Sequence, residues 1–224
     1  MKDLNFIEIG TCCWDTLIES STDETIGLSV EPLQFYLDML PDKNNVKKLC
    51  AAVVPSEDYV DDSMNVYYVD NKLIETLNLG GWLKGCNSVG KPHDLHLNYY
   101  SDPSVWHFFN ENGRLSELPT LNLIEKGVVS TLKIKVYTYQ KLIEEFSIGN
   151  VNTLKVDAEG LDCKIVSDMI DYHKNDPSRY PKNVNFEANS HTPSQEKEDI
   201  VKKLKNFGYQ VYQSNNEISA VYGN

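Results

Sequence analysis

The sequence contains no Lys/Arg-rich block and no CxxC pair. Its 33 acidic residues outnumber 21 basic ones, for a formal net charge of −12. Nucleic-acid binding depends on clustered positive charge, so we expect no nucleic-acid partner. The five cysteines are an odd, scattered set. This usage argues against a disulfide framework or a zinc site, and predicts a reducing, intracellular location in the cytoplasm.

Long apolar runs are also missing. No stretch approaches the ~20 residues that a membrane-spanning helix needs, and the N-terminus lacks the layout of a signal peptide, so no membrane span is expected. The 224 residues, 41% of them hydrophobic, suffice for one α/β domain with a substantial core. The first expected strand begins almost at Met1, which leaves open that the domain was excised from a longer polypeptide. The sequence does not define the oligomeric state.

A dinucleotide-binding glycine fingerprint is a further absence. The turn after the first expected strand carries only Gly10, where a GxGxxG pattern would supply three glycines. A nicotinamide-dependent oxidoreductase is therefore a minor alternative. Thermal stabilisation by NAD, without stabilisation by a methyl donor, would favour it.

The pattern that is present is typical of an α/β fold. Strands and helices alternate at both ends of the chain, as expected for a sheet with helical crossovers. The N-terminal part predicts strands at 4–10, 26–30 and 46–54, with helices at 15–22 and 32–39. The C-terminal part predicts strands at 129–137, 151–156 and 184–187, helices at 138–146, 161–173 and 195–207, and a hairpin of 209–214 with 218–222.

Between these parts, residues 55–127 lose the regular pattern. The segment is rich in glycine, proline and aromatic residues, and only 65–69 (NVYYV) reads as a strand. Such an excursion within a regular chain is usually a set of functional loops, so we expect it to bind a substrate. The alternative is an insertion that only packs on the surface.

Acidic residues stand at the ends of four expected strands, namely Glu8, Glu31, Asp157 and Glu187. Ligands of open parallel sheets bind at the carboxyl ends of the strands. The sequence therefore predicts a ligand site at that edge, with Gly10 in its first turn.

These motifs resemble the FkbM-type S-adenosylmethionine-dependent methyltransferases over nearly the whole chain. Residues 6–15 (FIEIGTCCWD) are similar to the first motif of that family, and 29–32 (SVEP) to its second-strand element. Residues 154–160 (LKVDAEG) are close to its K-x-D-x-E-G signature, and 87–92 (NSVGKP) to a serine-containing loop. The resemblance implies a Rossmann-like class I methyltransferase fold: a mostly parallel seven-stranded sheet, helices on both faces, and the excursion as an insertion. The closing hairpin suits the antiparallel final strand of that sheet.

The resemblance implies S-adenosyl-L-methionine as cofactor. Backbone at Gly10 and Thr11 would approach its methionine part, Glu8 would set the turn or meet the amino group, and Glu31 would accept both ribose hydroxyls. The remaining expected cofactor-binding residues are Asp15, Pro32 and Ala52, with Ala51 or Ala52 flanking the adenine. Glu31 has the alternative role of capping a helix at Pro32. The first motif departs from the family at Glu8, Cys12 and Trp14.

O-methylation requires removal of a proton from the acceptor hydroxyl. Asp157 is the first choice as base, Glu159 either assists or holds the turn, and His191 is the alternative base. Oxygen ligands from Asp157, Glu187 and Asn189 would suit Mg²⁺ or Mn²⁺.

The implied acceptor is a sugar hydroxyl of a glycan or glycoconjugate, with a deoxyhexose such as rhamnose as an example. We expect its hydroxyls to bond Asn87, Ser88, Lys91, His93 and His96, and its apolar face to stack on aromatic residues chosen from Trp82, Tyr99, Tyr100 and Trp106. A non-catalytic alternative is a degenerate methyltransferase fold that serves as a binding module. The departures from the family motif at Cys12 and Trp14 support this alternative.

Overall fold

The computed structural model describes the chain except residues 14, 98–121, 126, 190–191 and 224. The described residues form two compact units. The first comprises Met1–Ser63 and Lys135–Asn224, and the second comprises Met64–Ile134. No helix of the described residues has the length and apolar character required to cross a membrane.

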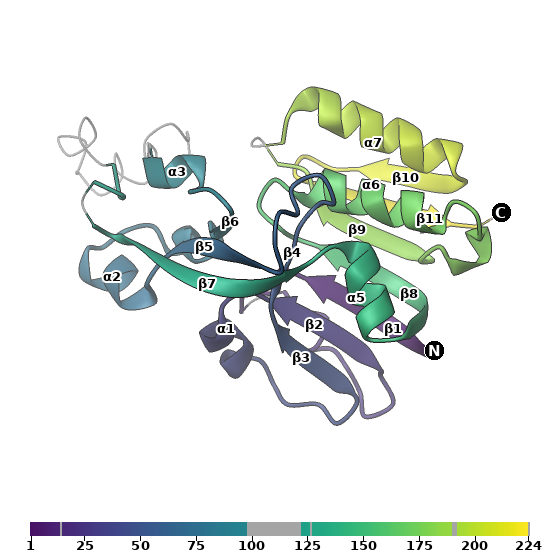
Figure 1. The fold of residues 1–224 in the computed structure, drawn as a ribbon, viewed down its shortest axis with the longest axis horizontal. Coiled ribbons are helices and arrows are strands. Elements are labelled where there is room, and N and C mark those ends of the chain that lie inside the picture. Colours follow the sequence, from purple (N-terminus) through teal and green to yellow (C-terminus); the bar gives the residue numbers. More distant parts are fainter. Residues whose placement is uncertain (14, 98–121, 126, 190–191, 224) are drawn as a thin grey trace. The chain divides into compact units, whose positions relative to one another are not determined.

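A seven-stranded sheet forms the centre of the first unit (Figure 1). Its strands are β1 (Lys2–Ile9), β2 (Gly27–Glu31), β3 (Val46–Cys50), β8 (Ile148–Val156), β9 (Asn183–Glu187), β10 (Tyr209–Gln213) and β11 (Glu217–Tyr222). Their order is β10-β11-β9-β8-β1-β2-β3. The pairings from β3 to β9 are parallel, whereas β11 is antiparallel to both β9 and β10. The sheet is therefore mixed, and the expectation of a mostly parallel sheet is corrected.

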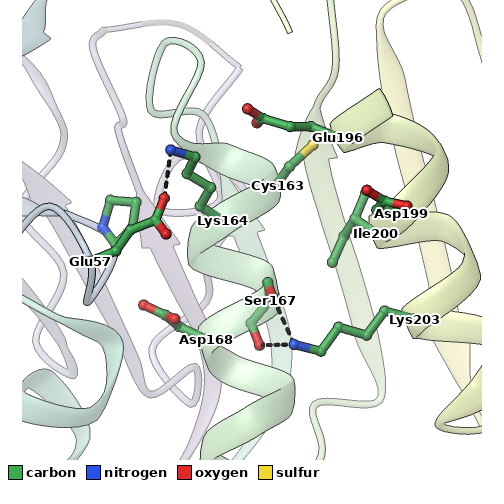
Figure 2. A pocket seen from close by; sticks show the side chains of 10 residues that line it. Glu57, Cys163, Lys164, Ser167, Asp168, Glu196, Asp199, Ile200 and Lys203 are labelled. Carbon is green, nitrogen blue, oxygen red and sulfur yellow. Dashed lines mark hydrogen bonds and ion pairs between the residues drawn. The ribbon is translucent and has the colours of Figure 1, made fainter. Parts of the chain in front are cut away.

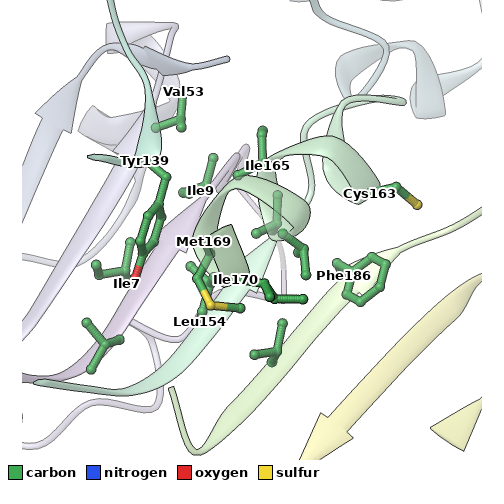
Figure 3. Packing of buried hydrophobic residues seen from close by; sticks show 14 of the residues in the cluster. Ile7, Ile9, Val53, Tyr139, Leu154, Cys163, Ile165, Met169, Ile170 and Phe186 are labelled. Carbon is green, nitrogen blue, oxygen red and sulfur yellow. The ribbon is translucent and has the colours of Figure 1, made fainter. Parts of the chain in front are cut away.

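The two faces of this sheet are covered by different helices. On one face, α5 (Tyr139–Glu145), α6 (Asp162–His173) and α7 (Ser194–Asn206) pack over a core that includes Ile7 and Ile9 (Figure 3). On the other face, α1 (Gln34–Met39) contacts β2 and β3. Phe6 packs with Leu37 of α1 in a separate cluster. Alternation along β1 sends Phe6 and Ile7 to opposite faces. The α/β class expected from the sequence is confirmed.

The strand expected at 46–54 is divided in two. β3 ends at Cys50, and β4 (Ala52–Val53) pairs with the C-terminal end of β7 (Val129–Tyr137) in parallel. The break falls at Ala51, whose N–H donates to the Glu31 carbonyl at 3.1 Å. The chain thus changes its pairing partner at a small buried residue.

The helix expected at 15–22 is absent from the described residues, which form turns there. Asp15 has a φ of 52° and cannot continue a helix. The Leu17 N–H is bound by the Glu8 carboxylate, and the Thr16 N–H by the Glu19 carboxylate at 3.3 Å. Both N–H groups would lack a carbonyl partner even in a helix that began at residue 15. The Leu17 carbonyl, which would accept the Ser21 N–H in a helix, instead accepts the Ser20 and Ser21 hydroxyls at 3.1 and 2.8 Å, a competition that apolar periodicity does not reveal.

The second unit contains short elements around its own core. They are most of β5 (Ser63–Val69), α2 (Asn71–Thr76), the 3₁₀ helix η1 (Gly81–Lys84), β6 (Ser88–Val89), α3 (Asp94–Leu97) and the N-terminal part of β7. Strand β5 confirms the expected strand and pairs antiparallel with β6. Among the described residues, the core of the second unit includes Val69, Ile74, Leu79, Leu83, Cys86, Leu95, Leu123 and Val128. The unit is shifted along the chain relative to the expected excursion of 55–127.

Candidate site at the carboxyl ends of the strands

The turn after β1 lies where the strand order reverses, between β1 and β8. Gly10 N–H donates to the Val30 carbonyl at 2.9 Å, and Asp157 N–H donates to the Ile9 carbonyl at 2.8 Å. A Cβ atom on Gly10 would lie 1.7 Å from the Asp157 carbonyl oxygen, and its φ is +76°. Glycine is therefore required here by the close approach of the two strand ends.

Glu8 lies beneath this turn with no exposed surface. Its two carboxylate oxygens accept the Leu17 N–H at 2.9 and 3.0 Å, and the Lys155 ammonium lies 3.4 Å from Oε1. Burial raises the pKa of Glu8, while the Leu17 N–H and Lys155 act in the opposite direction. Of the two expected roles, the contacts are those of a residue that sets the turn.

Glu31 connects the first two strand ends. Its Oε2 accepts the Cys12 N–H at 2.8 Å, and its Oε1 accepts the Leu33 N–H at 3.0 Å. The side chain is buried, since the residue is only 2% exposed. Burial raises the pKa of Glu31 to about 7, although these backbone donors favour its charged form. The second of these bonds is the local capping contact considered as the alternative role.

The other expected cofactor residues differ in accessibility. Thr11 and Ala52 are buried, and Pro32 and Gly10 are half-buried. Asp15 is exposed, and the Lys155 ammonium donates to its carbonyl and lies 3.4 Å from its carboxylate. Lys155 thus joins the turn to the sheet between Glu8 and Asp15. Lys155 lies directly opposite Glu8 in the β1–β8 register, a position where opposite charges attract.

Three carboxylates converge at the ends of β8 and β9. One oxygen each from Asp157, Glu159 and Glu187 lies within 4.8 Å of the others. Burial, followed by the charge of Asp157, raises the pKa of Glu187 to about 7 and that of Glu159 well above its usual range. Burial also raises the pKa of Asp157. These three residues are called the acidic triad below. Their carboxylates have the chemistry needed to bind a cation or to accept a proton.

Asp162 holds the turn that carries Glu159. Its carboxylate accepts the Ala158 N–H at 2.9 Å and the Gly160 N–H at 3.1 Å. Glu159 and Gly160 have φ values of 49° and 88°, so two successive residues are left-handed. The sequence interpretation missed Asp162, although an acid in the first turn of an expected helix was a usable signal.

Asn189, an expected metal ligand, lies beside the triad. Its Nδ2 donates to Glu187 Oε2 at 2.7 Å, and its backbone carbonyl accepts from Lys197. The amide nitrogen, rather than the oxygen that a cation needs, thus faces Glu187. His191 and Trp14 lie outside the described residues.

The expected acceptor-binding residues lie in the second unit. Ser88 Oγ donates to the Lys91 carbonyl at 2.8 Å, and Asn87 Nδ2 donates to the Lys84 carbonyl at 2.8 Å. His93 is buried and accepts the Leu95 N–H at 3.1 Å. Lys91 is exposed. Tyr99, Tyr100 and Trp106 lie outside the described residues, while Trp82 is half-buried against the core of the unit.

His96 has no exposed surface. Its Nδ1 accepts the His93 N–H at 3.3 Å. Burial, followed by the charge of His93, lowers the pKa of His96 to about 4. The residue is therefore neutral at pH 7 and belongs to the core of the second unit.

A cavity of about 220 Å³ lies between α6 and α7 (Figure 2). The Lys164 ammonium pairs with Glu57 at 2.6 Å, and the Lys203 ammonium donates to Ser167 Oγ and Asp171 at 2.7 Å each. Both lysines on its wall are therefore neutralised by partners. None of the expected site residues lines this cavity.

The chain matches no family model, no curated protein and no solved structure. The first unit is an α/β structure with a mixed seven-stranded sheet, compatible with a Rossmann-like fold. The acidic triad fits a hard divalent cation, because all three donors are carboxylate oxygens. Glu31 fits a ribose diol in hydrogen-bond capacity, since a carboxylate has about four lone-pair sites. Its 2% exposure means that the turn above it has to open for such contact.

Proposed function

We propose that the chain is an S-adenosylmethionine-dependent O-methyltransferase that acts on a sugar hydroxyl. One observation carries the proposal: Gly10, Glu31 and the acidic triad stand on adjacent strand ends around the point where the strand order reverses. Ligands of open α/β sheets bind at such a switch point. The antiparallel final strand, β11, also agrees with the sheet implied by the FkbM resemblance.

The donor side of the proposed site is the turn from Gly10 to Thr11 together with Glu31. The bound donor supplies a methyl group on a positively charged sulfur. Backbone at Gly10 lets the methionine part approach, and Glu31 accepts the ribose hydroxyls through lone pairs left over from its bonds to Cys12 and Leu33. Ala51 or Ala52 would flank the adenine, and Pro32 and Asp15 are the remaining expected cofactor-binding residues.

The acceptor side is the acidic triad. Asp157 would take the proton of the attacking hydroxyl as its oxygen bonds the methyl carbon and the carbon–sulfur bond breaks, which leaves S-adenosylhomocysteine. Burial raises the pKa of Asp157, which makes it a stronger base than an ordinary aspartate. Glu159, in the turn that Asp162 holds, would assist by placing a further carboxyl group beside Asp157. His191 remains the alternative base.

A divalent cation is part of the proposal. Asp157, Glu159 and Glu187 would hold Mg²⁺ or Mn²⁺, which polarises a hydroxyl and lowers its pKa. Glu159 replaces Asn189 in the ligand set expected from the sequence, because Asn189 presents its nitrogen to Glu187. EDTA treatment tests this part, because an unchanged methylation rate would rule out a requirement for the metal.

The acceptor class rests on the FkbM resemblance and on the polar residues of the second unit. Asn87, Ser88, Lys91 and His93 remain its predicted contacts. The test is incubation of the full chain with labelled donor and a panel of methyl glycosides, followed by location of the methylated hydroxyl. Asp157→Asn should abolish turnover and leave the affinity for S-adenosylhomocysteine nearly unchanged. Full turnover by this variant would rule out a role for Asp157 as base or metal ligand.

A binding module without catalysis is the second candidate. The burial of Glu31 favours it, because a ribose-binding carboxylate should be accessible. Calorimetry with S-adenosylhomocysteine separates the two candidates. Binding that is lost in Glu31→Ala supports the enzyme, and absence of binding by the intact chain supports the module.

A further inference from the structure

Cys12 and Cys13 form an adjacent pair of thiols in the turn that follows β1. Their sulfur atoms lie 3.9 Å apart, and both residues are partly exposed. Cys86 and Cys163 are buried, and the partly exposed Cys50 directs its thiol to the Pro32 carbonyl at 3.5 Å. The pair is therefore the place where two reachable thiols are already in contact.

We propose that Cys12 and Cys13 are a redox modification site, which a disulfide oxidant such as glutathione disulfide converts to a reversible vicinal disulfide. One cysteine thiolate attacks glutathione disulfide, giving a mixed disulfide and releasing one glutathione thiolate. The second cysteine thiolate attacks the protein sulfur of the mixed disulfide and releases the other glutathione. Two protein thiols are oxidised, one glutathione disulfide is reduced, and the two thiol protons end on the two glutathione molecules.

The geometry makes this disulfide labile. Adjacent Cα atoms are about 3.8 Å apart across a trans peptide, which is below the usual range of about 4.4–6.8 Å for a disulfide. The sulfur atoms must also close from 3.9 Å to about 2.05 Å. Strained disulfides have more oxidising potentials and are readily reduced, as regulatory ones must be.

Formation of the bond changes the turn at Glu31. Cys12 already has a φ of 41°, and its N–H donates to Glu31 Oε2 at 2.8 Å. The ring closed by the disulfide contains the peptide between Cys12 and Cys13, which adjoins the peptide that carries this N–H. Rotation of the ring peptide shifts Cys12 and weakens the bond from its N–H to Glu31, in a buried position where such a bond contributes most.

Mass spectrometry of the full chain tests the modification. The protein is treated with glutathione disulfide at mildly alkaline pH, because burial raises the pKa of the Cys12 thiol and the thiolate is the reacting form. We expect the loss of two hydrogen masses within the tryptic peptide 3–43, which contains only these two cysteines, and recovery with dithiothreitol.

Matched variants locate the bond. Cys50→Ser should still lose two hydrogens, whereas Cys13→Ser should give a glutathione adduct without that loss. Three results overturn the proposal: no change in mass, stable mixed disulfides alone in the unmodified sequence, or a two-hydrogen loss that persists in Cys13→Ser.

The effect on ligand binding rests on the proposed function. Calorimetry with S-adenosylhomocysteine should show about tenfold weaker binding to the oxidised protein, as expected for one weakened buried hydrogen bond to a charged group. Equal affinities would disprove the coupling to Glu31. If the reduced protein does not bind, the proposed function fails, while the mass result decides the redox site separately.

Discussion

Gly10 has surroundings that tolerate no side chain. In Gly10→Ala, the new Cβ would lie 1.7 Å from the Asp157 carbonyl oxygen, on a residue with a φ of +76°. Relief requires β1 and β8 to separate at their ends, where the Asp157 N–H bonds the Ile9 carbonyl. We expect the free energy of unfolding to fall by at least about 3 kcal/mol, measured by urea denaturation.

Gly160→Ala is the matched control for that substitution. Gly160 has a φ of +88°, but a Cβ there would meet no atom within 4 Å. Only the left-handed backbone opposes the alanine, at a cost of about 1–2 kcal/mol. Equal losses in the two variants would show that the contact between Gly10 and Asp157 is relieved without cost.

Glu187 should make stability depend on pH. Its pKa is raised to about 7 by burial and the charge of Asp157, from an ordinary value of 4.5. The folded state therefore binds the proton more tightly than the unfolded chain. The stabilisation is complete below about pH 4.5 and is lost as the pH rises through about 7.

Glu187→Gln removes this titration and keeps an oxygen for Asn189 Nδ2. The variant should be more stable than the unmodified sequence at pH 8, by about 3 kcal/mol at most, with the difference vanishing near pH 4.5. Urea denaturation at several pH values measures the effect. Glu198→Gln, on the exposed side of α7, should show none. A difference that is the same at all pH values would refute the raised pKa of Glu187.

Among the elements, the turn between β8 and α6 depends on one side chain. Asp162→Ala leaves the N–H groups of Ala158 and Gly160 without their acceptor, which should cost about 1–3 kcal/mol. Asp162→Asn retains one acceptor oxygen and should lose less. Burial raises the pKa of Asp162 to about 8, so the neutral amide resembles the protonated side chain at pH 7. Equal stabilities of the alanine variant and the unmodified sequence would contradict this role.

The elements also show what sequence patterns can predict. Helix α6 and the hairpin of β10 with β11 were predicted because their apolar periodicity reflects one buried face. The helix at 15–22 was predicted wrongly because Asp15 is left-handed and the Ser20 and Ser21 hydroxyls bind the Leu17 carbonyl. Periodicity reports burial, and it does not report which side chain binds a backbone group.

At the scale of the whole molecule, the strand ends with acids were predictable and their contacts were not. Alternating strands and helices implied a sheet whose carboxyl ends meet at one edge, so Asp157 and Glu187 were expected together. That Glu159 joins them depends on two left-handed residues after β8, held by Asp162. The short elements of the second unit lack a sustained period, which is why only its two longer strands, β5 and β7, were predicted among the described residues.

The net charge of −12 predicts a general response to salt, against which a specific cation site can be measured. Any salt screens repulsion among the excess acids and should raise the urea midpoint. If the acidic triad binds Mg²⁺, MgCl₂ should raise the midpoint further than NaCl at the same ionic strength. The corresponding surplus in the free energy of unfolding should reach about 2.7 kcal/mol when the Mg²⁺ concentration is a hundredfold above its Kd.

The surplus should disappear in Asp157→Asn, whose amide is a weaker ligand, but persist in Glu198→Gln, which removes one charge from an exposed position on α7. Comparing the two variants separates a site from a change in net charge, since both lose one negative charge. Equal midpoints in MgCl₂ and NaCl for the unmodified sequence would show that the triad holds protons rather than a cation. In that case Asp157 would have to act as a base without metal assistance.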